Sequence, residues 1–143
     1  MDITIPINGI RLNLRTAVIL ETRKGYIFEK DLKNGFYWIA GGRIQINETS
    51  EEAAKREIKE ELNMNIENIK LKAIMESFFE LEKEKFHEIC FYYRCKTNQD
   101  VNLPKNFYAF SREELNTVHI EPKILLDIIN SESDEIVHLT IHE

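Results

Sequence analysis

Several kinds of residue are scarce in this sequence, and each shortage excludes a class of protein. The longest apolar stretches are far shorter than the roughly 20 residues of a membrane-spanning helix, so no membrane partner is expected. Lysine and arginine number 19 against 25 aspartates and glutamates, which gives a net charge of -6. This shortage of positive charge argues against a nucleic-acid polymer as the main partner, because phosphate backbones are held by lysine and arginine.

Cysteine is also scarce, with only Cys90 and Cys95 in the chain. Both lie in a stretch with the composition of a strand, and their odd spacing directs them to opposite faces, which argues against a disulfide between them. The segment from Met1 to Pro6 has no basic residues ahead of an apolar run, so no signal peptide is expected. Free thiols are typical of a reducing compartment, and we therefore expect a cytoplasmic protein.

What the sequence does contain is the composition of one folded domain, covering residues 1–143, with 43% hydrophobic and 31% charged residues. Turn residues and apolar patterns predict strands at 11–22, 26–28, 36–39, 69–81, 86–95, 107–110 and 136–141. Helices are predicted at 49–62, 111–115 and 121–129. Because hairpins are mixed with helices in this order, an α/β (α+β) fold is favoured over a doubly wound parallel sheet.

The helix at 49–62 carries the candidate chemistry. Thr49 and Glu52 form a capping-box pattern at its start. A turn of about 100° per residue places Glu57, Glu60 and Glu61 on one face, beside a separate apolar stripe. Like charges at these spacings repel each other. A hard divalent cation would offset that repulsion, although a solvated acidic face would have the same pattern.

The loop before this helix favours a cation site over a solvated acidic face. Gly41 and Gly42 end an aromatic segment, and glycine lets the backbone approach a ligand closely. Glu48, at the end of the loop, can pair with Arg56 and hold the loop against the helix. A main-chain carbonyl of the glycine pair could join a metal shell, while a simple tight turn is the alternative.

From Gly42 to Met64 the sequence resembles the Nudix box, GX5EX7REUXEEXGU, in which U is a bulky aliphatic residue. Every fixed charged residue stands at its spacing, and Ile58 and Met64 fill the two U positions. Asn63 replaces the last glycine, and asparagine tolerates the left-handed conformation at a helix end. Ala40 stands where many members carry proline. The resemblance implies the family's α/β/α sandwich, with a mixed sheet rich in antiparallel hairpins.

The resemblance also implies a hydrolase that cleaves the pyrophosphate linkage of a nucleoside diphosphate joined to another moiety. Arg56 would orient the box glutamates, Glu48 would brace the loop, and Glu57 is the first choice as general base. Metal ions in such a site neutralise phosphate charge and lower the pKa of bound water. The residues implied to hold Mg²⁺, or alternatively Mn²⁺, are Glu57, Glu60, Glu61 and, through its carbonyl, Gly41.

Members of the family often add a carboxylate from outside the box. Glu88 is the leading candidate for this further metal ligand, because it lies in a predicted strand, whereas Glu80, Glu82 and Glu84 are predicted to be in turns or at strand ends. Aromatic faces can stack a nucleobase, and basic residues can contact phosphate. The candidates for substrate binding are Phe36, Tyr37, Trp38, Lys30, Arg43 and His87, each with an ordinary core or surface role as the alternative.

The substrate subclass stays open. The chain lacks the zinc ribbon of NADH-cleaving members, the downstream proline of many ADP-ribose-cleaving members and the tyrosine of dinucleoside-polyphosphate members. A MutT-like nucleoside triphosphate pyrophosphohydrolase is favoured, with an ADP-ribose or nucleotide-sugar pyrophosphatase as the alternative. A nucleotide-sensing module that binds without cleaving is the alternative from another class. A homodimer is also considered, through an apolar strand or residues 136–139.

Overall fold

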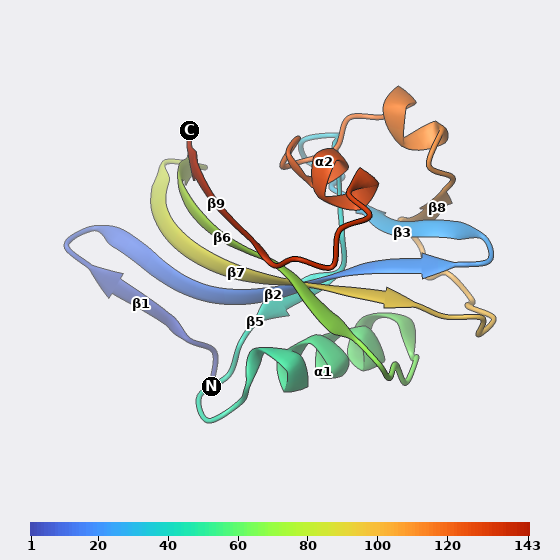
Figure 1. Cartoon of the computed structure of the whole chain (residues 1–143). Helices are drawn as coiled ribbons and strands as arrows, with labels where there is room; N and C mark the ends of the chain where they lie inside the picture. The colour runs from blue at the N-terminus through green and yellow to red at the C-terminus, as the bar shows by residue number, and fades with distance from the viewer.

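The computed structural model describes residues 1–143. Nine strands, two α-helices and a short 3-10 helix follow one another along the chain (Figure 1). None of the helices combines the length and apolar character needed to cross a membrane. The elements are β1 (Thr4–Ile7), β2 (Ile10–Thr22), β3 (Gly25–Lys30), β4 (Tyr37–Trp38), β5 (Gly41–Arg43), α1 (Ser50–Leu62), β6 (Lys70–Leu81), β7 (Glu84–Lys96), β8 (Phe107–Phe110), η1 (Glu114–Thr117), α2 (Leu125–Asn130) and β9 (Val137–His142).

One mixed sheet forms the centre of the molecule. Its main path runs β4-β3-β2-β7-β6-β9, with β1 and β5 pairing with β2, and β8 pairing with β3. The long strands β2 and β7 pair in parallel, and β6 and β7 form the predicted antiparallel hairpin. Glu82 and Lys83, at the tip of that hairpin, have positive φ values of 53° and 68°, which matches the twist of a tight hairpin turn.

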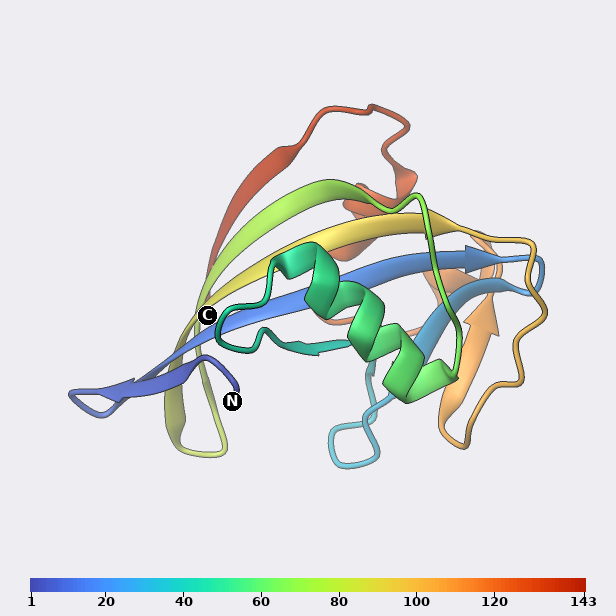
Figure 2. The same ribbon diagram turned by 90° about the horizontal axis from the view of Figure 1, so that it is seen from below.

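Alternation along the strands divides the buried residues between two cores, one on each face of the sheet. On β2, Val18 and Leu20 pack beneath α1, whereas Ala17 and Ile19 pack on the face that α2 covers. Figures 1 and 2 show α1 and α2 on opposite sides of the sheet. The expected α/β/α sandwich with a mixed sheet is confirmed.

The two cysteines follow the same alternation. Cys90 belongs to the core beneath α2 and Cys95 to the core beneath α1, and both are free. Burial raises the pKa of Cys90 to about 12. The predicted absence of a disulfide is therefore correct.

The largest differences between prediction and structure concern β1, β5, η1 and α2. β1 was not predicted; Asn8 and Gly9 turn it back onto β2 with φ values of 50° and 78°. The glycine pair, expected to follow a strand, is itself in β5. The helix expected from residue 121 begins at Leu125, because the Glu121 amide still donates to the Tyr37 carbonyl of β4 and is not yet free to enter a helix. The helix expected at 111–115 is instead the 3-10 helix η1 at Glu114–Thr117.

Candidate active site

Helix α1 is fixed to the sheet at its N-terminus. The predicted capping box forms, with the Thr49 hydroxyl accepting from the Glu52 amide and the Glu52 carboxylate accepting from the Thr49 amide. Thr16 of β2 donates to the Ser50 carbonyl at 3.2 Å, and the Ser50 and Tyr93 hydroxyls are 2.6 Å apart. Because these contacts lie in the first turn, they set the height of the helix over the sheet.

The glycine pair lies between α1 and β2. In β5, Gly41 and Gly42 pair with Ala17 and Thr16. A Cβ on Gly42 would fall 2.5 and 2.6 Å from the two carboxylate oxygens of Glu57, a separation that real Cβ atoms do not show. A Cβ on Gly41 would collide with the backbone of Thr16 and Ala17 instead. Glycine is needed at both positions because the backbone passes so close to the helix and the strand.

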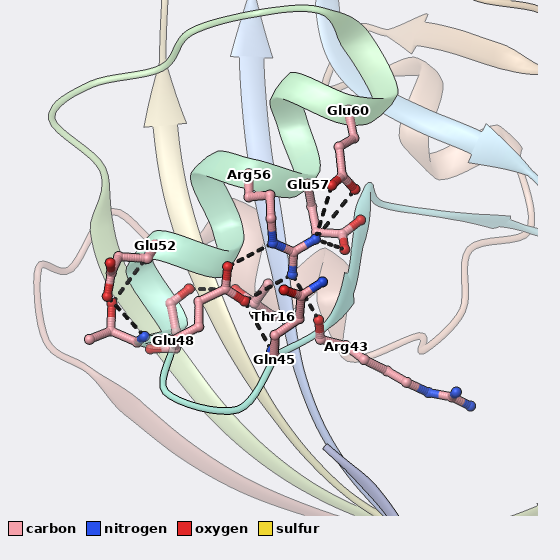
Figure 3. Close-up of polar contacts among 10 residues, drawn as sticks. Thr16, Arg43, Gln45, Glu48, Glu52, Arg56, Glu57 and Glu60 are labelled. Atoms are coloured by element: carbon pink, nitrogen blue, oxygen red, sulfur yellow. Dashed lines mark hydrogen bonds and ion pairs between the residues drawn. The ribbon is translucent and has the colours of Figure 1, made fainter. Parts of the chain in front are cut away.

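Arg56 binds three of the predicted site carboxylates (Figure 3). Its Nε and Nη2 donate to the two oxygens of Glu48 at 2.7 and 2.9 Å. Its Nη1 donates to Glu57 at 2.9 Å and to Glu60 at 3.3 Å, and Nη2 also donates to the Arg43 carbonyl at 3.1 Å. The guanidinium lowers the pKa of Glu48 through the direct hydrogen bond. The loop is thus held against the helix in the predicted manner.

Glu61 differs from the other box glutamates because Arg56 does not bind it. Burial and the neighbouring Glu57 raise its pKa to about 8, the charge of Glu29 adds to the rise, and Arg15 opposes it. Its Oε2 is buried and has no hydrogen-bond partner. A buried carboxylate oxygen without a partner costs free energy that a cation or a proton would recover.

No group of three or more acidic, histidine or cysteine side chains has the geometry of a metal site in this structure. The donor set nevertheless fits a hard divalent cation. Glu57 lies against the backbone of Gly42, and Glu61 presents its unpartnered oxygen on the same helix face. Such cations take carboxylate and carbonyl oxygens, which are the atoms present here.

A cavity of about 620 Å³ opens on the face of the sheet that α2 covers, where Met75, Cys90 and Tyr92 of that core line it. Gly41 and Arg43 of β5 and Glu29 of β3 line it, whereas none of the box glutamates does. The charges of Glu29 and of Arg15, which also lines the cavity, act on Glu61. Beyond them the lining passes over β2 and β7 to the aromatic end of the β6–β7 hairpin. Its size is that of a small-molecule site, and half of its 22 lining residues are hydrophobic.

The predicted aromatic contacts divide between cavity and core. Phe36 and Trp38 line the cavity with their rings 5.2 Å apart, and Trp38 is 38% exposed. Tyr37 alternates away from them and packs edge-on against Phe110 at 5.1 Å. Lys30 places its ammonium over the ring of Tyr37, 5.8 Å from the centroid, and does not line the cavity.

The remaining candidates also occupy different places. Arg43 lines the cavity, although its side chain points away from Arg56 in Figure 3. Glu88 lines the cavity on β7, whereas His87 lies outside it, with its ring 4.4 Å from that of Phe78. The role of Glu88 as a further metal ligand stays a prediction.

Among the cavity residues that were not predicted from the sequence are the polar Asn13, Arg15 and Glu29. Arg15 and Asn13 lie on the cavity side of β2, and Glu29 lies near the end of β3. Polar residues recurring at every second position within an apolar strand were the available signal for Asn13 and Arg15. Glu29 carried no such signal, because its charge acts on Glu61 only once the chain has folded.

Comparison with known proteins agrees with this geometry. The family model of the NUDIX domain matches residues 7–137. The mutator MutT protein from Bacillus halodurans superposes with a TM-score of 0.76 at 18% identity, over 91% of this chain and 89% of its own. The MutT NUDIX hydrolase from Burkholderia pseudomallei gives 0.67 at 18%, over 83% and 98%. An Ap4A hydrolase from C. elegans gives 0.60 at 14%, over 82% and 93%.

The family match extends over most of the chain, well beyond the box at Gly42 to Met64. It therefore includes the strands that pair with β5 and form the cavity. The solved structures agree in fold over more than four-fifths of this chain. The chain therefore belongs to the Nudix family and is a Nudix hydrolase.

Proposed function

We propose that this hydrolase cleaves the pyrophosphate linkage of a small nucleotide, with Mg²⁺ or Mn²⁺ held by the box. The observation that carries the proposal is the Arg56 network, in which one guanidinium fixes Glu48 and two further box glutamates at 2.7–3.3 Å. A solvated acidic face has no need of a half-buried ion pair between the loop and the helix. The close approach of Gly42 to Glu57 supports the same reading.

Each box residue has a distinct part in the proposed reaction. Glu57, Glu60 and Glu61 would hold the cation, with the Gly41 carbonyl as a further ligand. A bound divalent cation supplies charge neutralisation at the phosphates and a lowered pKa for water. Arg56 holds Glu57 in place through a hydrogen bond to one carboxylate oxygen, so that the other oxygen would be free to accept the proton of the attacking water.

The cavity supports a nucleotide as the substrate. Its volume of about 620 Å³ suits a molecule of that size, and it joins aromatic side chains to a polar floor. Trp38 and Phe36 would stack on the base, and Arg43 would contact phosphate oxygens. A nucleoside triphosphate is the preferred substrate, in keeping with the MutT proteins of the same fold.

A hydrolysis screen tests the proposal. Nucleoside triphosphates, ADP-ribose, nucleotide sugars and dinucleoside polyphosphates would be incubated with Mg²⁺ or Mn²⁺, and phosphate products quantified. We expect turnover of at least one class, with Glu60→Gln and Glu61→Gln losing a hundredfold or more. Glu51→Gln is the matched control, because Glu51 lies on α1 but pairs only with Lys55.

Binding of Mn²⁺, followed by calorimetry, gives a second readout that does not need turnover. Wild type and Glu51→Gln should bind the ion, and Glu61→Gln should bind it more weakly. Turnover of no substrate with either metal would overturn the proposal. Tight nucleotide binding without product would favour the sensing module instead.

A further inference from the structure

The floor of the cavity contains a polar group that the proposed reaction does not use. Asn13 of β2 is only 1% exposed and lines the cavity, and its Oδ1 has no hydrogen-bond partner. Its Nδ2 donates to Glu88 Oε2 at 3.3 Å. A buried carbonyl oxygen without a donor costs free energy, so an Asn kept there for packing alone would be a poor choice.

Asn13 belongs to a row of three side chains across neighbouring strands. β2 and β7 lie side by side (Figure 2) and pair in parallel. Asn13 and Glu88 are direct register partners in this pairing. Arg15 stands two residues further along β2 on the same face, with its Nε 3.8 Å from Glu88 Oε1. Since Glu88 contacts both neighbours, the order of the row is Asn13, Glu88, Arg15.

The three side chains of this row offer a ligand a fixed order of hydrogen-bond acceptors and donors. Asn13 offers an acceptor through Oδ1, Glu88 offers acceptors only, and Arg15 offers donors only. The complementary ligand edge therefore presents donor, donor and acceptor in the same order. Among the common nucleobases guanine has this edge, with its 2-amino group, its N1–H and its O6.

We infer that Asn13, Glu88 and Arg15 form a base-reading subsite that selects a 2-amino-6-oxopurine edge. The inference rests on the proposed function for the presence of a nucleotide in this cavity. Phe36 and Trp38 line the same cavity and supply a stacking surface. Adenine would turn the lone pair of N1 toward the Glu88 carboxylate, and hypoxanthine would leave Asn13 Oδ1 unpaired. Both mismatches leave a buried acceptor without a donor, which is a costly outcome.

The test measures binding of GDP, IDP and ADP by calorimetry in the presence of EDTA, so that neither metal nor turnover is needed. Wild type should bind GDP about tenfold or more tightly than IDP and ADP, since a good two-bond base contact discriminates on that scale. Asn13→Ala should remove the difference between GDP and IDP while leaving IDP affinity nearly unchanged. Equal affinities in wild type, or no binding of any of the three, would overturn the inference.

Glu88→Gln keeps the size of the side chain and tests the row even if Asn13→Ala folds poorly. A glutamine can donate to the lone pair of adenine N1, which the Glu88 carboxylate cannot do, so the preference for GDP over ADP should shrink. A misfolded protein cannot produce such a shift. Glu80→Gln is the matched control, because Glu80 also lines the cavity but lies on the β6–β7 hairpin, away from the floor.

Two outcomes separate this inference from its alternatives. If Glu88→Gln lowers binding of all three nucleotides equally and also weakens Mn²⁺ binding, Glu88 is a metal ligand and the inference fails. If guanine is preferred in binding while no nucleotide is hydrolysed, the subsite stands and the proposed pyrophosphate cleavage fails. Hydrolysis without base preference would support the cleavage and overturn the subsite.

Discussion

Gly42 of the box lies directly against the carboxylate of Glu57, the proposed general base. Its missing side chain leaves the space that the Glu57 carboxylate fills. Gly42→Ala should displace Glu57 rather than the backbone, because the far end of a long side chain yields most easily. We expect kcat to fall about a hundredfold, as displacements near 1 Å do in active sites, with little loss of stability. Steady-state kinetics and thermal unfolding measure the two effects.

Gly41→Ala is the contrasting variant, since its Cβ would meet the backbone of Thr16 and Ala17. It should lose stability as well as activity, because two paired strands must move apart. If the two variants behaved alike, the separate roles of the glycines would be contradicted.

Glu61 gives the metal-free protein a pH dependence. Its pKa rises from 4.5 to about 8 on folding, so between these values the folded state binds more protons than the unfolded state. The free energy of unfolding must therefore fall as pH rises from about 5 to about 8, and level off above. Thermal unfolding in EDTA measures this fall, which Glu61→Gln should reduce. A fall of the same size in Glu61→Gln would assign it to other groups.

At the scale of the element, α1 was predicted well because its signals are local. The capping box, the carboxylate face and the Arg56–Glu48 pair all lie within a short span of sequence, where spacing fixes geometry. The cavity floor could not be predicted in this way. Asn13 and Glu88 are 75 positions apart, and only the parallel pairing of β2 with β7 brings them together.

The start of α2 was predicted less well than α1 because the contacts that position α2 are long-range. They come from basic side chains on the sheet. Arg94 of β7 donates to the carbonyls of Ile128, Ile129 and Ser131 at 3.0–3.5 Å, at the C-terminus of the helix. Lys72 of β6 is buried beside it and donates to the Ser133 carbonyl. These contacts could not be predicted from the sequence around residue 125, because their donors lie on distant strands.

Arg94→Ala should therefore loosen α2. Losing charge-assisted bonds to several helix-end carbonyls should cost about 2 kcal/mol and lower Tm by roughly 6 °C. Arg23→Ala is the control, because its pair with Asp100 is exposed and such pairs contribute little. Equal shifts in Tm for the two variants would show that Arg94 does not hold the helix end.

At the scale of the whole molecule, metal binding and folding must be linked. The proposed ligands come from β5 and from α1, and α1 is packed on the central strands by one of the two cores. The unfolded chain does not gather these ligands, so an ion bound to the folded state adds stability according to its concentration and Kd. The acidic chain, with a net charge of -6, should also gain from the neutralisation.

With Mn²⁺ at about one hundred times its Kd, the gain is about 2.7 kcal/mol, or roughly 5–10 °C in Tm. The gain should shrink below pH 8, because Glu61 must release its proton before it can bind the ion. Glu60→Gln and Glu61→Gln should show much smaller gains than Glu51→Gln, measured as Tm with Mn²⁺ against EDTA. A gain that is equal in all three variants would place the ion elsewhere on the acidic surface, since only a site built from the box loses its ion with the box glutamates.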